Sequence, residues 1–298
     1  DLCDRSAIIN HGRVFACDSP ANLKKRLQRE AIFHLDVSPL DGALPDCEAL
    51  PGVRKLVHTP GDEKSELELI LTADEAISGV ILFDETIRTA GLDGTPFPQI
   101  LTKKGGLPGI KVDKGPIEIP GLPGETVTEG LDGLRARVKE CKELGAKFAK
   151  WRAVITIGEG IPTQNCLVEN AHALARYAAL CQEGGIVPIV EPEVLLDGNH
   201  SIERCEEVTE TTLRITFSTL LGQRVHLEGM ILKPSMVVSG KDNPRQAGVA
   251  EVAERTLRCL KRTVPGAVPG IAFLSGGQSA VSATEHLNAM NAMGSHPW

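Results

Sequence analysis

Short apolar runs separated by amphipathic stretches organise the chain from about residue 73 onward. The runs start roughly 30–45 residues apart, a spacing typical of repeated strand–helix units, and lie at 78–83, 109–112, 148–155, 186–190, 227–232 and 270–274. Between most of them, apolar residues recur at the three-to-four spacing of helices, at 129–144, 165–183, 202–221, 246–262 and 279–293. Strands that alternate with helices predict a parallel sheet, and their continuous apolar character predicts burial on both faces.

The alternation predicts an α/β fold, and a (β/α)₈ barrel of the TIM type is the first interpretation because the visible strands are numerous and evenly spaced. An open doubly wound sheet is the second. The sequence contains neither G-x-G-x-x-G nor G-x-x-x-x-G-K-[ST], which weakens a nucleotide-binding interpretation of either fold.

Residues 1–72 follow a different, mixed pattern. Strands are predicted at 7–10 and 13–16, around His11-Gly12, at 31–37, and in a hairpin formed by 53–59 and 65–71. Ser19-Pro20 predicts the start of a helix over 21–27, because Ser suits an N-cap and Pro suits the first helical position. We therefore divide the chain into a small α+β segment, 1–72, and a barrel-type domain, 73–298.

Composition narrows the class of protein. Of 298 residues, 42% are hydrophobic and only 3% aromatic, so a core is possible and must consist mainly of aliphatic side chains. A net charge of −7 argues against a nucleic-acid surface, and no apolar run approaches the length of a membrane span. The eight cysteines form no C-x-x-C pair, which indicates reduced thiols in an intracellular protein. The first residue is Asp, so we expect a fragment.

Charged residues gather where the predicted strands end, which is where barrel active sites lie. Residues two apart project to the same side of a strand, and three such pairs occur: Lys111 with Asp113, Lys150 with Arg152, and Glu191 with Glu193. The fifth run ends in Lys233, and the sixth ends in Ser275-Gly276-Gly277.

This set has a chemical logic. An amine attacks a carbonyl only in its neutral form, which burial or a nearby cation favours, and Lys233 follows a strongly apolar run. Lys150 could supply the nearby charge, and Glu191 and Glu193 could move protons during carbinolamine formation and dehydration. The glycine-rich turn before a predicted helix offers N–H groups to a phosphate. Schiff-base chemistry on a phosphorylated carbonyl compound follows as a hypothesis.

Each residue alone has a simpler interpretation. A single Lys near a strand end is usually a solvated or ion-paired surface residue. Glu-x-Glu can cap a loop, and Ser-Gly-Gly is most often an ordinary turn. The hypothesis rests on all of these features falling at consecutive predicted strand ends.

From about residue 71 to residue 298 the chain resembles class I fructose-bisphosphate aldolase, the metal-free, Schiff-base kind. The resemblance rests on ISGVILFDET (77–86), GIKVDKG (109–115), FAKWR (148–152), IVPIVEPE (186–193), EGMILKPSMV (228–237) and FLSGGQS (273–279). It implies a (β/α)₈ barrel without metal or other cofactor, in a cytoplasmic homotetramer of glycolysis. It also implies reversible cleavage of fructose 1,6-bisphosphate to dihydroxyacetone phosphate and glyceraldehyde 3-phosphate.

The resemblance also implies individual roles. Lys233 corresponds to the Schiff-base lysine, Glu191 to the proton-transfer glutamate, Glu193 to its supporting carboxylate, and Lys150 to the charged partner in carbinolamine chemistry. Substrate-binding roles fall to the remaining matches, which are Lys111, Arg152, Ser275 and Gly276.

Two family segments have no match in this chain. The first-strand Ala-Ala-Asp-Glu-Ser, whose Asp acts in C–C bond cleavage, is not found, and the chain ends before the eighth-strand Ser-Tyr-Gly-Arg, whose Gly and Arg bind phosphate. We therefore expect an incomplete barrel lacking strands one and eight, with weak or no cleavage activity.

Residues 1–72 resemble a different family, the C-terminal part of an ABC-transporter ATP-binding subunit of the drug-exporter type. The stretch LCDRSAIINHGRVFACDSPANLKKRL (2–27) carries this resemblance, and the nucleotide-binding motifs of that family lie upstream of it. An inactive chimeric or transporter-associated interaction protein is therefore the alternative to an aldolase. A metal-dependent aldolase is a third hypothesis, although no H-x-H or H-x-x-H occurs.

Overall fold

The structure, a computed structural model, describes residues 78–91 and 93–296 in full and, before them, the backbone of five strands. The chain forms two compact units. One comprises Asp1–Val80 with Thr89–Leu107, and the other comprises Ile81–Arg88 with Pro108–Trp298. All of the predicted site residues belong to the second unit.

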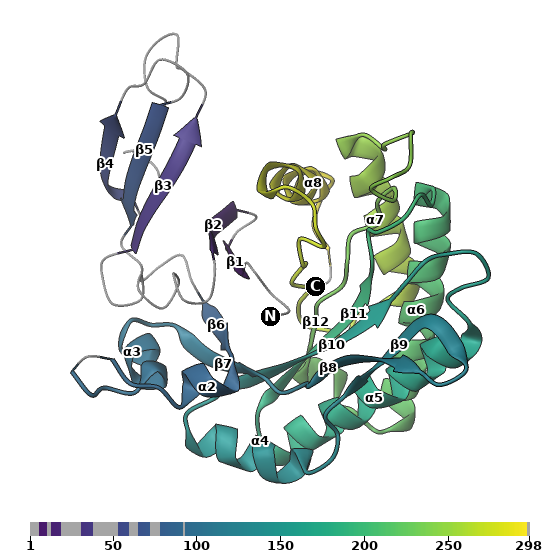
Figure 1. Cartoon of the computed structure of the whole chain (residues 1–298), viewed down its shortest axis with the longest axis horizontal. Helices are drawn as coiled ribbons and strands as arrows, with labels where there is room; N and C mark the ends of the chain where they lie inside the picture. The colour runs from purple at the N-terminus through teal and green to yellow at the C-terminus, as the bar shows by residue number, and fades with distance from the viewer. Residues whose placement is uncertain are drawn as a thin grey trace. The chain divides into compact units, whose positions relative to one another are not determined.

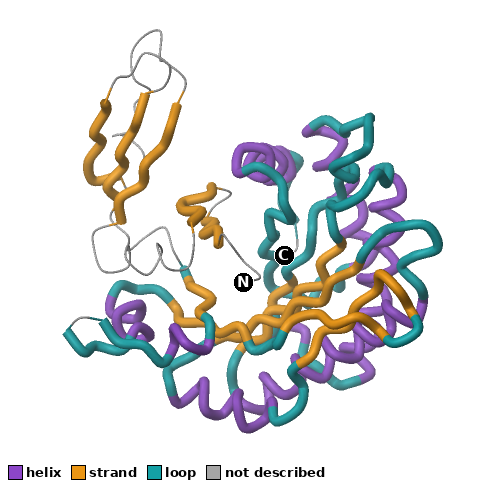
Figure 2. The backbone as a smooth tube through the Cα atoms, viewed as in Figure 1, coloured by secondary structure: helices purple, strands orange, loops and turns teal. Residues whose placement is uncertain are grey.

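A five-stranded sheet forms the centre of the second unit (Figures 1 and 2). Its order is β12-β11-β10-β7-β6, so neighbours in space follow one another in the chain. The strands are β6 (Gly79–Leu82), β7 (Leu107–Lys111), β10 (Phe148–Ile155), β11 (Val187–Val194) and β12 (Ile231–Leu232). The pairs β7–β10, β10–β11 and β11–β12 are parallel, which confirms the predicted parallel α/β sheet.

Side chains of β10 alternate between a buried apolar face and a face that carries Lys150 and Arg152. Ala149, Trp151 and Ala153 are fully buried, and the Trp151 ring lies 5.4 Å from the Tyr177 ring of the covering helix. Successive side chains of a strand point to opposite faces, so Lys150 and Arg152 project away from that helix. The apolar residues thus anchor the strand while its cations stay available for chemistry.

Helices alternate with the strands along the chain. The second unit contains α2 (Asp84–Ile87), α4 (Leu134–Glu143), α5 (Gln164–Gly184), α6 (Ile202–Gly222), α7 (Val249–Thr263) and α8 (Ala280–Ala292), and the first unit contains α3 (Phe97–Lys103). Helix α5 packs on β10 and β11, α6 on α5, α7 on α6, and α8 on α7. In Figure 1, α4 and α5 lie along the same side of the sheet. Hydroxyl caps start three of the helices, at Thr163, Ser201 and Ser279.

The predicted helix over 129–144 was too long. Glu129 is the last residue of an antiparallel hairpin formed by β8 (Gly115–Ile119) and β9 (Leu122–Glu129), a turn follows it, and α4 begins only at Leu134. The Pro120-Gly121 turn, with Gly121 at φ +82°, reverses the chain between the two strands. The hairpin packs against β10, where Thr126 and Thr128 donate hydrogen bonds to the carbonyls of Val154 and Arg152.

Two other predicted strands are shorter than expected. The run 227–232 opens as a 3₁₀ helix, η2 (Leu227–Gly229), and only Ile231 and Leu232 pair as a strand. The run 270–274 contributes a single parallel bridge, between Ile271 and Leu232. Backbone hydrogen bonds still join the two segments, from Leu232 N to the Gly270 carbonyl at 3.2 Å and from Ala272 N to the Leu232 carbonyl at 2.9 Å.

In the first unit, most predicted strands are confirmed. β1 (Ser6–Asn10) and β2 (Arg13–Asp18) pair antiparallel, and β3 (Ala31–Val37), β5 (Ser65–Leu71) and β4 (Val53–Thr59) form a three-stranded antiparallel sheet. The predicted helix over 21–27 and the turn at His11 lie outside the described residues. Among the described helices, none combines the length and apolar character needed for a membrane span.

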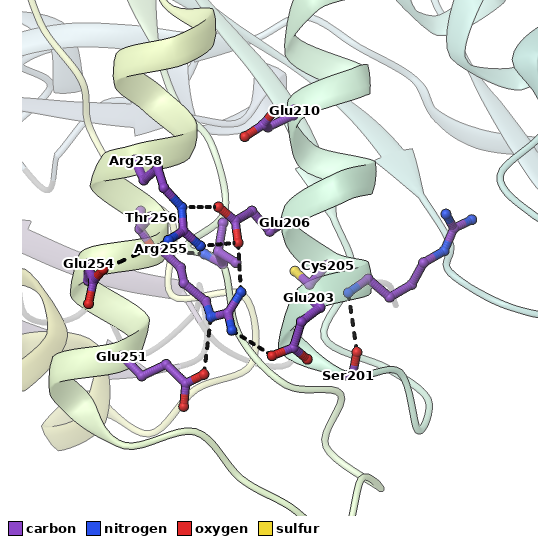
Figure 3. Close-up of polar contacts among 12 residues, drawn as sticks. Ser201, Glu203, Cys205, Glu206, Glu210, Glu251, Glu254, Arg255, Thr256 and Arg258 are labelled. Carbon is purple, nitrogen blue, oxygen red and sulfur yellow. Dashed lines mark hydrogen bonds and ion pairs between the residues drawn. The ribbon is translucent and has the colours of Figure 1, made fainter.

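Ion pairs between α6 and α7 fix the outer helices (Figure 3). The central group is the buried carboxylate of Glu206, which accepts hydrogen bonds from Arg258 Nε at 2.7 Å and Arg255 Nη1 at 2.8 Å. The Arg258 guanidinium, with Arg255, holds the pKa of Glu206 below its ordinary value of 4.5. Arg255 also contacts Glu203 and Glu251, so a single α7 arginine links both helices.

We expect Glu206→Gln to lower the free energy of unfolding by about 2 kcal/mol at neutral pH, because charge-assisted hydrogen bonds to two arginines are lost. A carboxylate whose pKa is lowered by folding stabilises the native state above its ordinary pKa and loses that contribution as pH falls through its folded value. The difference between the variants should therefore shrink in denaturant titrations below pH 4.5.

Glu254→Gln is the matched control, since the Glu254 side chain is 71% exposed and lies 3.8 Å from Arg258. Exposed pairs of this kind contribute little. Equal effects of the two substitutions at neutral pH would contradict the role given to Glu206.

The five cysteines of the described helices are buried free thiols: Cys141, Cys166, Cys181, Cys205 and Cys259. Burial raises the pKa of each thiol, to about 12 for Cys166 and Cys181. Since the thiolate is the reactive form, we expect none of the five to be alkylated by iodoacetamide at pH 8 in the native protein, and all five after unfolding. Peptide mass mapping reads this out, and rapid native labelling of Cys166 or Cys181 would contradict the packing.

Candidate active site

Seven charged side chains from the carboxyl ends of four strands form one cluster, called the charge cluster below. Its members are Lys111 and Asp113 at the end of β7, Lys150 and Arg152 on β10, Glu191 and Glu193 on β11, and Lys233 after β12. Parallel pairing places Arg152 opposite Glu191, and the Lys233 N–H donates to the carbonyl of Val190 at 2.8 Å. The strand register itself therefore brings the charges together.

Glu191 lies at the centre of the charge cluster. Its carboxylate is only 4% exposed, and Lys233 Nζ donates a hydrogen bond to Oε1. Oε2 lies 3.1 Å from Lys150 Nζ, an ion pair without hydrogen-bond geometry. One buried carboxylate is thus shared by two lysines, and Lys233, at 22% side-chain exposure, keeps access to a substrate.

Asp113 holds the other side of Lys150. This carboxylate, 2% exposed, lies 2.6 Å from Lys111 Nζ and 3.6 Å from Lys150 Nζ, and it accepts the backbone N–H of Arg152 at 3.2 Å. Sequence reasoning placed Asp113 beside Lys111 but gave it no place in the site. The same-side spacing of Lys111 and Asp113 was the signal that could have included it.

Glu193 contacts a cation different from those of Glu191. Arg152 Nε donates to Glu193 Oε2, and the Arg152 side chain is 38% exposed. The two glutamates of β11 therefore have separate partners, with Glu191 between two lysines and Glu193 on the arginine.

The charges of the cluster do not cancel. Four cations face three carboxylates, which leaves one positive charge in a largely buried site. Charges in such surroundings are screened less than on the surface. The arrangement therefore suits an anionic substrate that brings a carbonyl group to Lys233.

Ser275 and Gly276 lie in a tight turn that follows the bridge at Ile271. Gln278 N donates to the Ser275 carbonyl at 3.1 Å, and the turn needs positive φ at both central residues, +61° at Gly276 and +90° at Gly277. Leu274 N donates to the carbonyl of Pro234 at 3.3 Å. The turn is thus tied to the residue that follows Lys233.

Backbone hydrogen bonds join the loop that follows β11 to the segment that follows β12. Backbone hydrogen bonds join Gly240 to His200 and Lys241 to Leu196, each at 2.9 Å. Gly240 has no room for a side chain, because a Cβ there would lie 2.3 Å from the Gly198 carbonyl oxygen. These bonds form a lock that connects the loop after Glu191 and Glu193 with the loop after Lys233.

Within residues 78–91 and 93–296, no group of three or more His, Cys, Asp and Glu side chains has an arrangement that could hold a metal ion.

Comparison with known proteins decides the family. The family model "Fructose-bisphosphate aldolase class-I" matches residues 60–298. The chain belongs to the class I fructose-bisphosphate aldolases. As a member of this family it is an aldehyde lyase, and an inactive transporter-associated protein is not favoured. The match begins upstream of residue 73, so the domain boundary at 72 stays a prediction.

Relatives and a solved structure agree with this assignment. The chain is 55% identical to a probable class 1 fructose-bisphosphate aldolase of Xanthomonas axonopodis over 88% of this chain and 81% of the relative. It is 53% identical to the cytosolic fructose-bisphosphate aldolase 6 of Arabidopsis thaliana over 78% of this chain and 65% of the relative. A Plasmodium falciparum aldolase, solved with TRAP and an inhibitor, superimposes with TM-score 0.74 at 47% identity, over 76% of this chain and 67% of that one.

Gly240→Ala tests the lock between the two loops. We expect a loss of about 1–3 kcal/mol in unfolding free energy, because the added methyl group must push the Gly198 backbone away. Gly266→Ala is the control, since this exposed glycine lies outside the helices and a Cβ there has nothing within 4 Å. Urea titrations of both variants measure this, and equal stabilities would show that the loops separate without cost.

Proposed function

We propose that Lys233 is the Schiff-base lysine of an aldol cleavage, that Glu191 transfers protons for it, and that the substrate is a ketose phosphate such as fructose 1,6-bisphosphate. The observation that carries this proposal is the buried Glu191 carboxylate in contact with both Lys233 and Lys150. A lysine with only a surface role would be solvated, and it would not share a buried carboxylate with a second lysine.

The first chemical step needs a neutral amine. Glu191 Oε1, which accepts from Lys233 Nζ, is the group to which the lysine proton passes. The amine nitrogen then bonds to the ketone carbon, the carbonyl oxygen takes the proton held by Glu191, and the nitrogen gives one further proton to Glu191, which produces a carbinolamine. Glu191 passes this second proton to the carbinolamine hydroxyl, which leaves as water while the nitrogen lone pair forms the iminium ion.

Lys150 acts through charge in this scheme. It lies between the carboxylates of Glu191 and Asp113, at 3.1 and 3.6 Å. Its ammonium stabilises negative charge on the substrate oxygen during carbinolamine formation. For cleavage, the hydroxyl group on the carbon that becomes the aldehyde gives its proton to Glu191, and the electron pair of the breaking C–C bond moves to the iminium ion to form an enamine. Glu191 returns the proton to the enamine carbon, and water hydrolyses the resulting iminium ion to release the ketone and free Lys233.

The binding roles go to the remaining predicted residues. Lys111 and Arg152 provide cations at the edges of the charge cluster, with side chains 25% and 38% exposed. The turn at Ser275 and Gly276 provides backbone N–H groups for a phosphate. Glu193 supports the site by orienting Arg152.

Several finer expectations belong to this proposal. We propose a barrel that lacks the first and eighth strands of the family pattern, a homo-oligomer (a tetramer by family resemblance) and a cytoplasmic location. The resemblance of residues 1–72 to an ABC-transporter ATP-binding subunit stays a prediction about that segment alone.

Borohydride trapping tests the assignment of Lys233. Hydride reduces an iminium ion to a stable secondary amine, so incubation with dihydroxyacetone phosphate and borohydride should label Lys233, as located by peptide mass mapping. Lys233→Met should abolish the label because, among the described residues, no other lysine donates a hydrogen bond to Glu191. Excess EDTA should leave the label unchanged.

Lys241→Met is the matched control, because Lys241 forms an exposed ion pair with Asp197 in a neighbouring loop. It should be labelled at Lys233 as the parent is. A label that persists in Lys233→Met, or that EDTA removes, would overturn the Schiff-base assignment.

A further inference from the structure

The carbonyl group of Ser275 is held by two donors of a single residue. Gln278 donates its backbone N–H at 3.1 Å and its side-chain Nε2 at 3.0 Å to this oxygen. The same Nε2 lies 3.7 Å from Met236 Sδ, three residues beyond Lys233. Gln278 therefore connects the turn to the segment that carries the Schiff-base lysine.

Gln278 is itself oriented by a residue of the helix that follows. His286 of α8 is buried, and its Nδ1 lies 2.7 Å from Gln278 Oε1. The Ser275 carbonyl can only accept, so the amide NH₂ of Gln278 must face it and Oε1 must face His286. His286 therefore carries its proton on Nδ1 and donates it to Gln278. Burial lowers the pKa of His286, which keeps the ring neutral.

The turn depends on such support. Gly276 and Gly277, both at positive φ, lack side chains that could fix the direction of their N–H groups, and glycine loses more conformational freedom on ordering than other residues. Two apolar neighbours restrict the turn, because a methyl group added at Gly276 would lie 3.0 Å from Leu274 and one at Gly277 would lie 3.3 Å from Leu196. The polar restraint comes from Gln278.

We propose that His286 is a positioning residue for phosphate recognition: through Gln278 it fixes the Ser275–Gly276 turn that receives the phosphate of the substrate. This inference rests on the proposed function. His286 contacts no substrate atom, and its effect should appear in affinity for a phosphorylated ketone and not in the chemistry at Lys233.

Two ketones separate these effects. Borohydride trapping at Lys233 is measured against concentration for dihydroxyacetone phosphate and for unphosphorylated dihydroxyacetone. His286→Leu removes the hydrogen-bond donor to Gln278 and replaces the imidazole with an apolar side chain of similar size. We expect it to raise the half-saturating concentration of dihydroxyacetone phosphate roughly fivefold, as the loss of one hydrogen bond implies, and to leave dihydroxyacetone unchanged.

Further variants distinguish positioning from general destabilisation. Gln278→Met should reproduce the loss, because Met cannot donate to the Ser275 carbonyl, and the double variant should be no weaker than Gln278→Met alone. His286→Asn, whose amide nitrogen takes the place of Nδ1, should restore most of the affinity. Asn288→Leu, at an exposed position of α8, is the control and should behave as the parent.

The trapping results distinguish an error in the proposed function from an error in the role given to His286. If the parent protein traps neither ketone at Lys233, the proposed function is wrong. If the parent traps both but His286→Leu and Gln278→Met leave the ratio of the two half-saturating concentrations unchanged, the inference on His286 is wrong. If His286→Leu does not fold, Gln278→Met alone decides, since Gln278 is only partly buried.

Discussion

The site depends on one buried carboxylate shared by two lysines. Glu191 is almost without solvent exposure and contacts Lys233 through one oxygen and Lys150 through the other. A carboxylate buried without partners would be strongly destabilising, and so would either ammonium alone. The three groups therefore stabilise one another, and the contact between Lys233 and Glu191 is the path that we propose for proton transfer.

The parallel sheet makes this arrangement possible. Adjacent strands carry charged residues at the same level of the sheet, and the ladder between β10 and β11 runs in register along the whole of both strands. On the opposite face, Trp151 packs against Tyr177, so the strand that carries Lys150 and Arg152 is anchored by apolar contacts. Alternate residues of β10 therefore pack in the core and carry the charged groups of the site.

Sequence periodicity predicted the parts of the fold in which one face of an element is buried. Helix α6 begins at Ile202, as expected, because its apolar spacing and the Ser201 cap agree. The hairpin of β8 and β9 was missed, since its strands are largely exposed and so lack a strong period of two. Pro120-Gly121 was the local signal for it.

The site was predictable where residues lie two apart on a strand, as Lys150 and Arg152 do. The different partners of Glu191 and Glu193 could not be predicted, because they depend on which neighbouring strand supplies each cation. Nor could the role of Asp113 or the link from His286 to Gln278, which joins residues whose contact is set by the packing of α8. Such tertiary contacts leave no periodic pattern in the sequence.

The most direct measurement compares Glu191→Gln with Glu193→Gln in the rate at which Lys233 forms the trapped iminium with dihydroxyacetone phosphate. We predict that Glu191→Gln lowers this rate about 100-fold or more, as expected for removal of a general acid–base group. Glu193→Gln, which alters only the contact with Arg152, should have a much smaller effect. Equal losses, or a larger loss for Glu193→Gln, would contradict the central place given to Glu191.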